Sequence, residues 1–359
     1  MKAVVTLLLC LLSAAVAAQP TAPFADSIRR AYHVPELSYA VVDGRAVVEI
    51  AALGRHAVHL PDTATLADRF HIGSNTKALT AFVAARCVEQ GNLRWDTRFF
   101  DLYPEWRSGS RPAYQGITLQ QLLSHRAGVA PFLGFDDPVI PDFRGSHAEM
   151  RRQFGRFVLT LEPVPLSPAE PFVYSNAGYT LAALMLEQAT GRTWEQLVER
   201  VLNHDLKLHA GLAAPDNQSR PDTWGHQLEN GQLQPVPSHP TDHLAYTEPA
   251  GDLNFTLPDY LRFIQLNLNG LAGQARYLRA DTYRLLHTGG EKYALGWFNI
   301  YENNQELSTH AGTTGTYYSL VHIDRLRHRA YVIFTNAGTD DAPQAARLLM
   351  RRLKATYAR

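Results

Sequence analysis

The sequence is poor in cysteine and has no excess of charge of either sign. Its two cysteines are Cys10, in an apolar run at the N-terminus, and Cys87, in a segment rich in helix formers. With one cysteine beyond that run, no internal disulfide is expected, so a hydrophobic core must hold the fold together. The formal net charge of zero gives no reason to expect a nucleic acid as a partner.

Long apolar runs are also missing, apart from the one at the N-terminus. Lys2 precedes apolar residues 3–14, and the small residues 16–18 follow before Gln19. This pattern is typical of a cleaved secretory signal, and the run is too short to span a membrane. We therefore predict a signal peptide over residues 1–18, a periplasmic or secreted protein, and no stable membrane span.

Lysine is scarce too, since only five of the 34 basic residues are lysines. One of them, Lys77, lies three residues after Ser74, and the apolar residues that follow have helical spacing. Residues three apart share one face of a helix. Unlike arginine, a lysine whose pKa is lowered by burial or by cations can take the proton of a serine. The pattern predicts Ser74 as a nucleophile and Lys77 as its base.

Acyl transfer needs further groups, namely a second proton carrier and donors that orient the substrate. Tyr174 and Asn176 offer both: nearby cations would lower the pKa of the tyrosine, and the amide can bond a substrate carbonyl and Lys77. The same Tyr-x-Asn pattern recurs at Tyr301 and Asn303. That copy lies at the end of an expected hairpin, so we favour Tyr174.

A donor side chain on a strand would complete such a site, and His-x-Gly occurs three times. His209 and His287 follow helical segments and are typical of helix ends. His310 lies in a strand pattern before Thr313, and Gly312 would let a substrate approach the backbone closely. We favour His310.

The order of these three motifs, at residues 74–77, 174–176 and 310–312, resembles the serine β-lactamase and penicillin-binding-protein superfamily in its class C-like branch. That branch includes class C β-lactamases, D-alanyl-D-alanine carboxypeptidases, D-amino-acid peptidases and β-lactamase-like esterases. The resemblance covers about residues 25–355. Further segments agree with it: Leu122–Gly128, Pro249-Ala250-Gly251, Tyr293–Trp297 and Thr335-Asn336.

The resemblance implies a role for each motif residue. Ser74 would be acylated, and Lys77 and Tyr174 would share the general-base role. The backbone N–H groups of Ser74 and Thr313 would form the oxyanion hole. Substrate contacts would come from three further positions: Asn176 would orient the substrate, Gly312 would leave room beside it, and His310 would stand where many β-lactamases have a lysine.

Histidine at position 310 departs from the β-lactamase pattern. It is only partly charged near neutral pH, which weakens the case for β-lactam hydrolysis. The leading hypothesis is an exported serine hydrolase acting on a small ester or a D-amino-acid amide or peptide. The alternatives are a β-lactamase or D-alanyl-D-alanine carboxypeptidase and, in another class, a non-catalytic penicillin- or peptidoglycan-binding module. The oligomeric state is left open.

No cofactor or metal is predicted. His56 and His59 have no carboxylate partner at helical spacing, and His239, Asp242 and His243 cluster in a proline-rich loop. Neither group has a zinc-type signature.

The order of patterns predicts a mixed α/β (α+β) fold. A hairpin signal surrounds Asp43-Gly44, and an antiparallel meander follows residue 293. Helical patterns fill the middle, with long loops and short helices expected at 131–171 and an irregular loop at 213–248. Because strands lie at both ends, we expect one antiparallel sheet flanked by helices, and the resemblance implies a β-lactamase/transpeptidase-like fold. The expected division is a sheet lobe (19–100 plus 250–359) and a helical and loop lobe (101–249).

Overall fold

The computed structural model describes residues 20–134, 137–169, 171–219, 222–239, 241, 243–274, 276–302 and 304–358. The predicted signal peptide lies outside these residues, as do Asp242 and Asn303. Within the described part, every helix is too short or too polar to cross a membrane.

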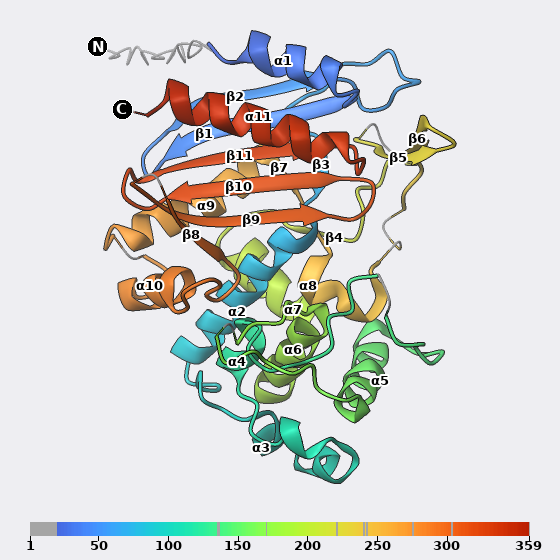
Figure 1. The fold of residues 1–359 in the computed structure, drawn as a ribbon, viewed down its shortest axis with the longest axis vertical. Helices are drawn as coiled ribbons and strands as arrows, with labels where there is room; N and C mark the ends of the chain where they lie inside the picture. The colour runs from blue at the N-terminus through green and yellow to red at the C-terminus, as the bar shows by residue number, and fades with distance from the viewer. Residues whose placement is uncertain are drawn as a thin grey trace, which may run out of the picture.

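A six-stranded antiparallel sheet unites the two ends of the chain (Figure 1). The turn at Asp43-Gly44 connects its first two strands, and the last strand of the chain pairs directly with the first. The predicted hairpin, the C-terminal meander and the mixed fold class are thereby confirmed. In their order across the sheet, the strands are β2 (Val47–Gly54), β1 (Glu36–Asp43), β11 (Arg329–Thr335), β10 (Tyr318–Asp324), β9 (Gln305–Thr313) and β8 (Phe298–Glu302).

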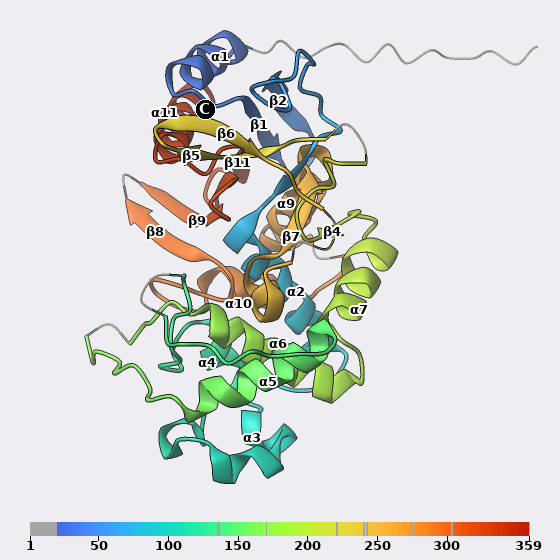
Figure 2. The same ribbon diagram turned by 90° about the vertical axis from the view of Figure 1, so that its right-hand side faces the viewer.

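Helices cover both faces of this sheet, so its central strands are buried on both sides. α1 (Ala22–Ala31) and α11 (Asp341–Thr356) pack on one face, and α9 (Leu257–Leu271) packs on the other (Figures 1 and 2). Successive residues of a strand point to opposite faces. Accordingly, Tyr39 belongs to the core under α1 and α11, and its neighbour Ala40 belongs to the larger core on the other side.

The middle of the chain forms a mainly helical half, which lies below the sheet in Figure 1. Its helix α6 ends at Gly191, which adopts the left-handed conformation that favours glycine. The α-helices outside the sheet layers are α2 (Thr76–Glu89), α3 (Phe99–Leu102), α4 (Leu119–Leu123), α5 (His147–Thr160), α6 (Asn176–Thr190), α7 (Trp194–Val198), α8 (Glu248–Gly251) and α10 (Ala280–Thr288). The short 3₁₀ helices are η1 (Gly73–Asn75), η2 (Pro104–Gly109), η3 (Pro112–Tyr114) and η5 (Ala245–Thr247). The segment η4 (Glu199–Asp205) is a π-helix.

Two stretches are more regular than predicted. The loop expected at 213–248 contains a hairpin of β5 (Gly225–Glu229) and β6 (Gln232–Val236), closed by Asn230 and Gly231, both with positive φ. Its strands consist mainly of polar residues, so the sequence lacks the apolar alternation by which a hairpin is predicted. The proline-dense stretch at 131–171 contains the 14-residue helix α5, started by a capping box at Ser146.

We predict that the core between the sheet and α11 is a main source of stability. Leu349 of α11 is fully buried in it, whereas Leu326, in the turn after β10, is mostly exposed. Leu349→Ala should lower the free energy of unfolding by about 2–5 kcal/mol, because it leaves a cavity. Leu326→Ala should change it by less than about 0.5 kcal/mol. Urea unfolding of both variants checks this, and equal effects would contradict it.

Candidate active site

Ser74 lies where a short strand turns into helix α2. β3 (Arg69–His71) pairs with β7 (Leu253–Thr256), and the chain then passes through η1 into α2. Ser74 therefore lies in a 3₁₀ turn just before α2 and is partly exposed, while Lys77 lies in the first turn of α2 and is fully buried. The predicted pair meets: Lys77 Nζ is 3.0 Å from Ser74 Oγ.

The Lys77 amine is surrounded by neutral groups. Besides Ser74, it contacts Asn176 Oδ1 at 2.7 Å and the backbone carbonyl oxygen of Ala250, in α8, at 2.9 Å. Burial holds the pKa of Lys77 well below its ordinary value. A neutral amine has two N–H donors and one lone pair. With the donors on Asn176 and Ala250, the lone pair faces the Ser74 hydroxyl, which is the arrangement a general base requires.

Tyr174 approaches the same pair. Desolvation raises the pKa of Tyr174, although a hydrogen bond with Ser74 opposes this in part. The sequence predicted instead that nearby cations would lower the pKa of Tyr174. Lys77 Nζ does lie 4.7 Å from the centre of the Tyr174 ring, but a neutral amine does not stabilise a phenolate. The Tyr174 phenol therefore keeps its proton and lies next to the Ser74 hydroxyl.

Asn176 ties Lys77 to a neighbouring loop. Its Oδ1 accepts from Lys77, and its Nδ2 donates to the backbone oxygen of Phe132 at 2.7 Å. Ser175 caps α6 and also donates to Ala130 O. The Nδ1 atom of buried His125 accepts the Ser175 N–H at 3.1 Å. His125 thus braces the segment that carries Tyr174 and Asn176.

Glycines allow β9 to lie directly against the Ser74 turn. A Cβ atom on Gly312 would lie 2.0 Å from Ile72 O and 2.8 Å from Ser74 N. A Cβ on Gly73, whose φ is +52°, would lie 2.6 Å from Thr313 N. Larger residues would force the two segments apart. The contact brings the backbones of Ser74 and Thr313 together, as an oxyanion hole requires.

His310 lies in β9 beside these groups but is almost completely buried. Burial, and to a lesser extent Lys77, lowers the pKa of His310 to about 3, so the imidazole is neutral. Its Nδ1 is 2.8 Å from Ala311 O, and its Nε2 is 3.2 Å from the Tyr293 hydroxyl. Both ring nitrogens are thus engaged: Nδ1–H donates to the carbonyl, and Nε2 accepts from the tyrosine.

Sequence reasoning missed two groups of the site. The Ala250 carbonyl is a ligand of Lys77, but a backbone oxygen has no residue-type signature. Tyr293 orients His310, and its hydroxyl also lies 3.5 Å from that of Tyr179. Tyr293 could have been found from the segment Tyr293–Trp297, which matches the family resemblance, but the resemblance gave no role to this tyrosine.

The competing motif copies lie elsewhere. Tyr301 is exposed on β8, and His209 is mostly exposed after η4. His287 is buried in α10, where its Nε2 bonds with Asn267 Oδ1. None of these three hydrogen-bonds with Ser74 or Lys77 in the described part of the chain.

A cleft of about 680 Å³ opens beside Ser74, and Asn176 and Thr313 line it. Its walls are largely apolar, with Phe132, Ile140 and Tyr246 among them. The charged side chains among its described lining residues are both acidic. They are Asp137, which accepts the N–H groups of residues 133 and 134, and exposed Asp340.

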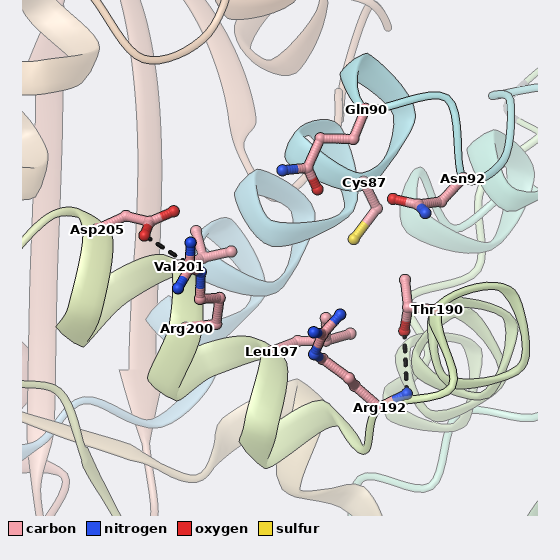
Figure 3. Close-up of a pocket in the computed structure, with 9 residues that line it drawn as sticks. All are labelled: Cys87, Gln90, Asn92, Thr190, Arg192, Leu197, Arg200, Val201 and Asp205. Atoms are coloured by element: carbon pink, nitrogen blue, oxygen red, sulfur yellow. Dashed lines mark hydrogen bonds and ion pairs between the residues drawn. The ribbon is translucent and has the colours of Figure 1, made fainter.

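A second cavity, of about 400 Å³, lies at the other end of α2 (Figure 3). None of the predicted site residues lines it. Two of its polar groups are already paired, because Arg200 contacts Asp205 and the Arg192 N–H bonds Thr190. Burial raises the pKa of the Cys87 thiol there to about 11, so the thiol is not activated.

Comparison with known proteins agrees with this fold. Residues 14–354 match the profile of the family described as Beta-lactamase. The chain is 23% identical over 317 residues to "Protein flp" of Staphylococcus aureus (strain N315), covering 87% of this chain and 61% of that protein. It is 27% identical over 250 residues to "Penicillin-binding protein 4" of Amycolatopsis lactamdurans, covering 68% of this chain and 62% of the relative. The chain thus spans about three fifths of the length of these curated relatives.

Two solved structures share the fold. One is the octameric penicillin-binding protein homologue from Pyrococcus abyssi, with a TM-score of 0.75, 20% identity and coverage of 92% of this chain and 76% of the other. The other is a D-stereospecific amidohydrolase from Streptomyces sp., with a TM-score of 0.69, 21% identity and coverage of 92% and 97%.

These matches define a protein of the serine hydrolase-like class of β-lactamases and penicillin-binding proteins. The chain belongs to the Beta-lactamase family, as the motifs predicted.

The lowered pKa of Lys77 can be measured without a substrate. In protein labelled with [¹³Cε]lysine, the Lys77 resonance, assigned by its loss in Lys77→Met, should titrate well below the ordinary lysine value of about 10.4. Asn176→Asp should raise this pKa, because a carboxylate beside Nζ favours the charged amine. Asn92→Asp, at an exposed position, is the matched control. A Lys77 resonance that titrates at the ordinary value would contradict the assignment.

Proposed function

We propose that this chain is an exported serine hydrolase that forms an acyl-enzyme at Ser74. The observation that carries the proposal is the contact of the Ser74 hydroxyl with the buried Lys77 amine, whose pKa is lowered by burial and whose other partners are neutral acceptors. A non-catalytic binding module would gain nothing from this amine, because burying it is costly. Export rests on the sequence of residues 1–18.

In the proposed first half-reaction, Lys77 takes the proton of Ser74 as Oγ attacks the substrate carbonyl carbon. The oxyanion that forms is bound by the backbone N–H groups of Ser74 and Thr313. The protonated Lys77 is then next to the Tyr174 hydroxyl, and one of these two groups returns a proton to the leaving alcohol or amine. In the second half-reaction, a water molecule, deprotonated by the same groups, hydrolyses the acyl-enzyme.

The charges around the cleft support an ester or an amide with a free amine as the substrate. β-Lactams and D-alanyl-D-alanine peptides carry a carboxylate, which a cation must receive. His310 is neutral, and the charged residues among the described lining of the cleft are Asp137 and Asp340. A carboxylate is repelled by such a cleft, whereas an ammonium group is attracted. We therefore propose a small ester or a D-amino-acid amide or peptide, and place β-lactams last.

Turnover by the mature protein tests the activity. We expect hydrolysis of a p-nitrophenyl ester, with little hydrolysis of the β-lactam nitrocefin. Ser74→Ala should lower the ester rate by at least about a thousandfold, because the nucleophile is lost. A fluorophosphonate should label wild type but not Ser74→Ala, and equal labelling of the two would refute the acyl-enzyme. Rapid turnover of nitrocefin would instead make the protein a β-lactamase.

The preference for an amine can be tested separately. Substrates are D-amino-acid p-nitroanilides, either with a free amine or N-acetylated. Asp340→Asn should raise KM for the free-amine substrate about two- to fivefold, the range expected of an exposed charge, and leave the acetylated one unchanged. Asp341→Asn, at the next position but outside the cleft lining, is the matched control. If both variants behave alike on both substrates, the charge of Asp340 does not contribute to substrate binding.

A further inference from the structure

A second cluster of ionisable side chains is buried at the edge of the sheet lobe. Glu36 is the first residue of β1, His56 follows β2, and Asp68 directly precedes β3. All three are buried. One potential ligand atom from each lies within 4.8 Å of the others. None of them takes part in the proposed reaction.

Glu36 is the most unusual member of the cluster. Its side chain is fully buried, and neither carboxylate oxygen has a hydrogen-bond partner among the described residues. The Asp68 carboxylate lies close to it, so two carboxylates meet in a buried place. An unpartnered buried carboxylate is costly unless a proton or a cation neutralises it.

His56 is oriented like a metal ligand. Its Nδ1 is 2.6 Å from Asp62 Oδ2, so Nδ1–H donates to that carboxylate and Nε2 is the ring nitrogen that an ion or a proton can occupy. Nε2 is 3.0 Å from Asp68 Oδ1, yet Nε2 makes no hydrogen bond in the described structure. Two lone pairs therefore face each other unless a positive charge lies between them. A carboxylate on the other ring nitrogen is the usual support of a metal-binding histidine.

The backbone around the cluster is held firmly. Asn336 Oδ1 accepts the N–H of Glu36 at 2.8 Å, and Asn336 Nδ2 donates to His56 O at 2.9 Å. Asp68 accepts from the Thr65 hydroxyl at 2.7 Å. The three candidate ligands are thus positioned by contacts that do not depend on an ion.

We propose that Glu36, His56 Nε2 and Asp68 bind a divalent transition-metal ion of the zinc type, with Asp62 orienting His56. One nitrogen and two carboxylate ligands suit such an ion and give a neutral site. Metal–ligand bonds of about 2.0–2.2 Å put ligand atoms about 3–3.5 Å apart. The 3.0 Å between His56 Nε2 and Asp68 Oδ1 is in this range. Closing Glu36 onto the ion takes a movement on the order of 1 Å.

The proposed ion is structural. It would join the start of β1 to the residue before β3, the strand that leads to Ser74, and so fix two segments of the sheet lobe that are distant in sequence. The competing explanation is a proton shared between Glu36 and Asp68. That explanation requires no metal, so metal binding distinguishes the two.

The test uses the full chain after removal of metal with a chelator. Calorimetric titration with Zn²⁺ should show one site, Co²⁺ should give visible absorption bands, and Zn²⁺ should raise the thermal unfolding midpoint by several degrees. Glu36→Gln and Asp68→Asn should abolish these effects. The matched control is His59→Asn, because His59 is exposed and contacts Trp224. This variant should bind like wild type.

Asp62→Asn keeps the test decisive if the buried variants do not fold, since Asp62 is partly exposed. It should weaken Zn²⁺ binding about 10–100-fold. Ester turnover by Ser74→Ala reports on the proposed function independently of these measurements. The proposal is overturned if stripped wild type binds neither ion at submillimolar concentration, or if Asp62→Asn and Glu36→Gln bind as tightly as wild type.

Discussion

The active site depends on one physical constraint, which is that Lys77 must be buried without a counter-ion. A carboxylate beside Nζ would stabilise the folded protein, but it would also keep the amine protonated and useless as a base. The protein instead surrounds Nζ with an amide oxygen, a backbone carbonyl and the Ser74 hydroxyl. These acceptors satisfy the N–H groups without fixing the charge. The desolvation that lowers the pKa is a cost that the rest of the fold must offset.

Ion pairs do occur close to Lys77, but they involve the residues around its partner Ala250 and not the Lys77 amine itself. The carbonyl of Ala250 belongs to the short helix α8, which begins at Glu248 and is capped at its end by Asp252. Glu248 pairs with buried Arg151, which also binds two further glutamates of the helical half. Asp252 contacts His71 of β3 and His243. These pairs position α8 while leaving the amine itself in neutral surroundings.

The sequence predicted those parts that depend on residue type and local order. Ser74, Lys77, Tyr174 and Asn176 were found because such residues at such spacing have few other uses, and the structure brings them together. Features that depend on tertiary burial were not predictable. The neutral state of His310 follows from β9 being covered, and the carboxylates around His56 come from positions 6, 12 and 20 residues away. The division into two lobes at the stated boundaries stays a prediction.

His310 links the tuning of the base to the choice of substrate. A lysine at that position, as the resemblance implies for many β-lactamases, would place a cation near Lys77 and lower its pKa by repulsion. With a neutral histidine, burial alone must lower it, and burial is the cause found here. Lys77, when protonated, in turn lowers the pKa of His310, because two cations so close together repel each other. Two neutral bases therefore stand side by side where relatives with a lysine have a fixed positive charge. The proposed nucleophile is in place but no cation among the described lining residues faces the cleft to attract a carboxylate, so the family alone does not determine the substrate.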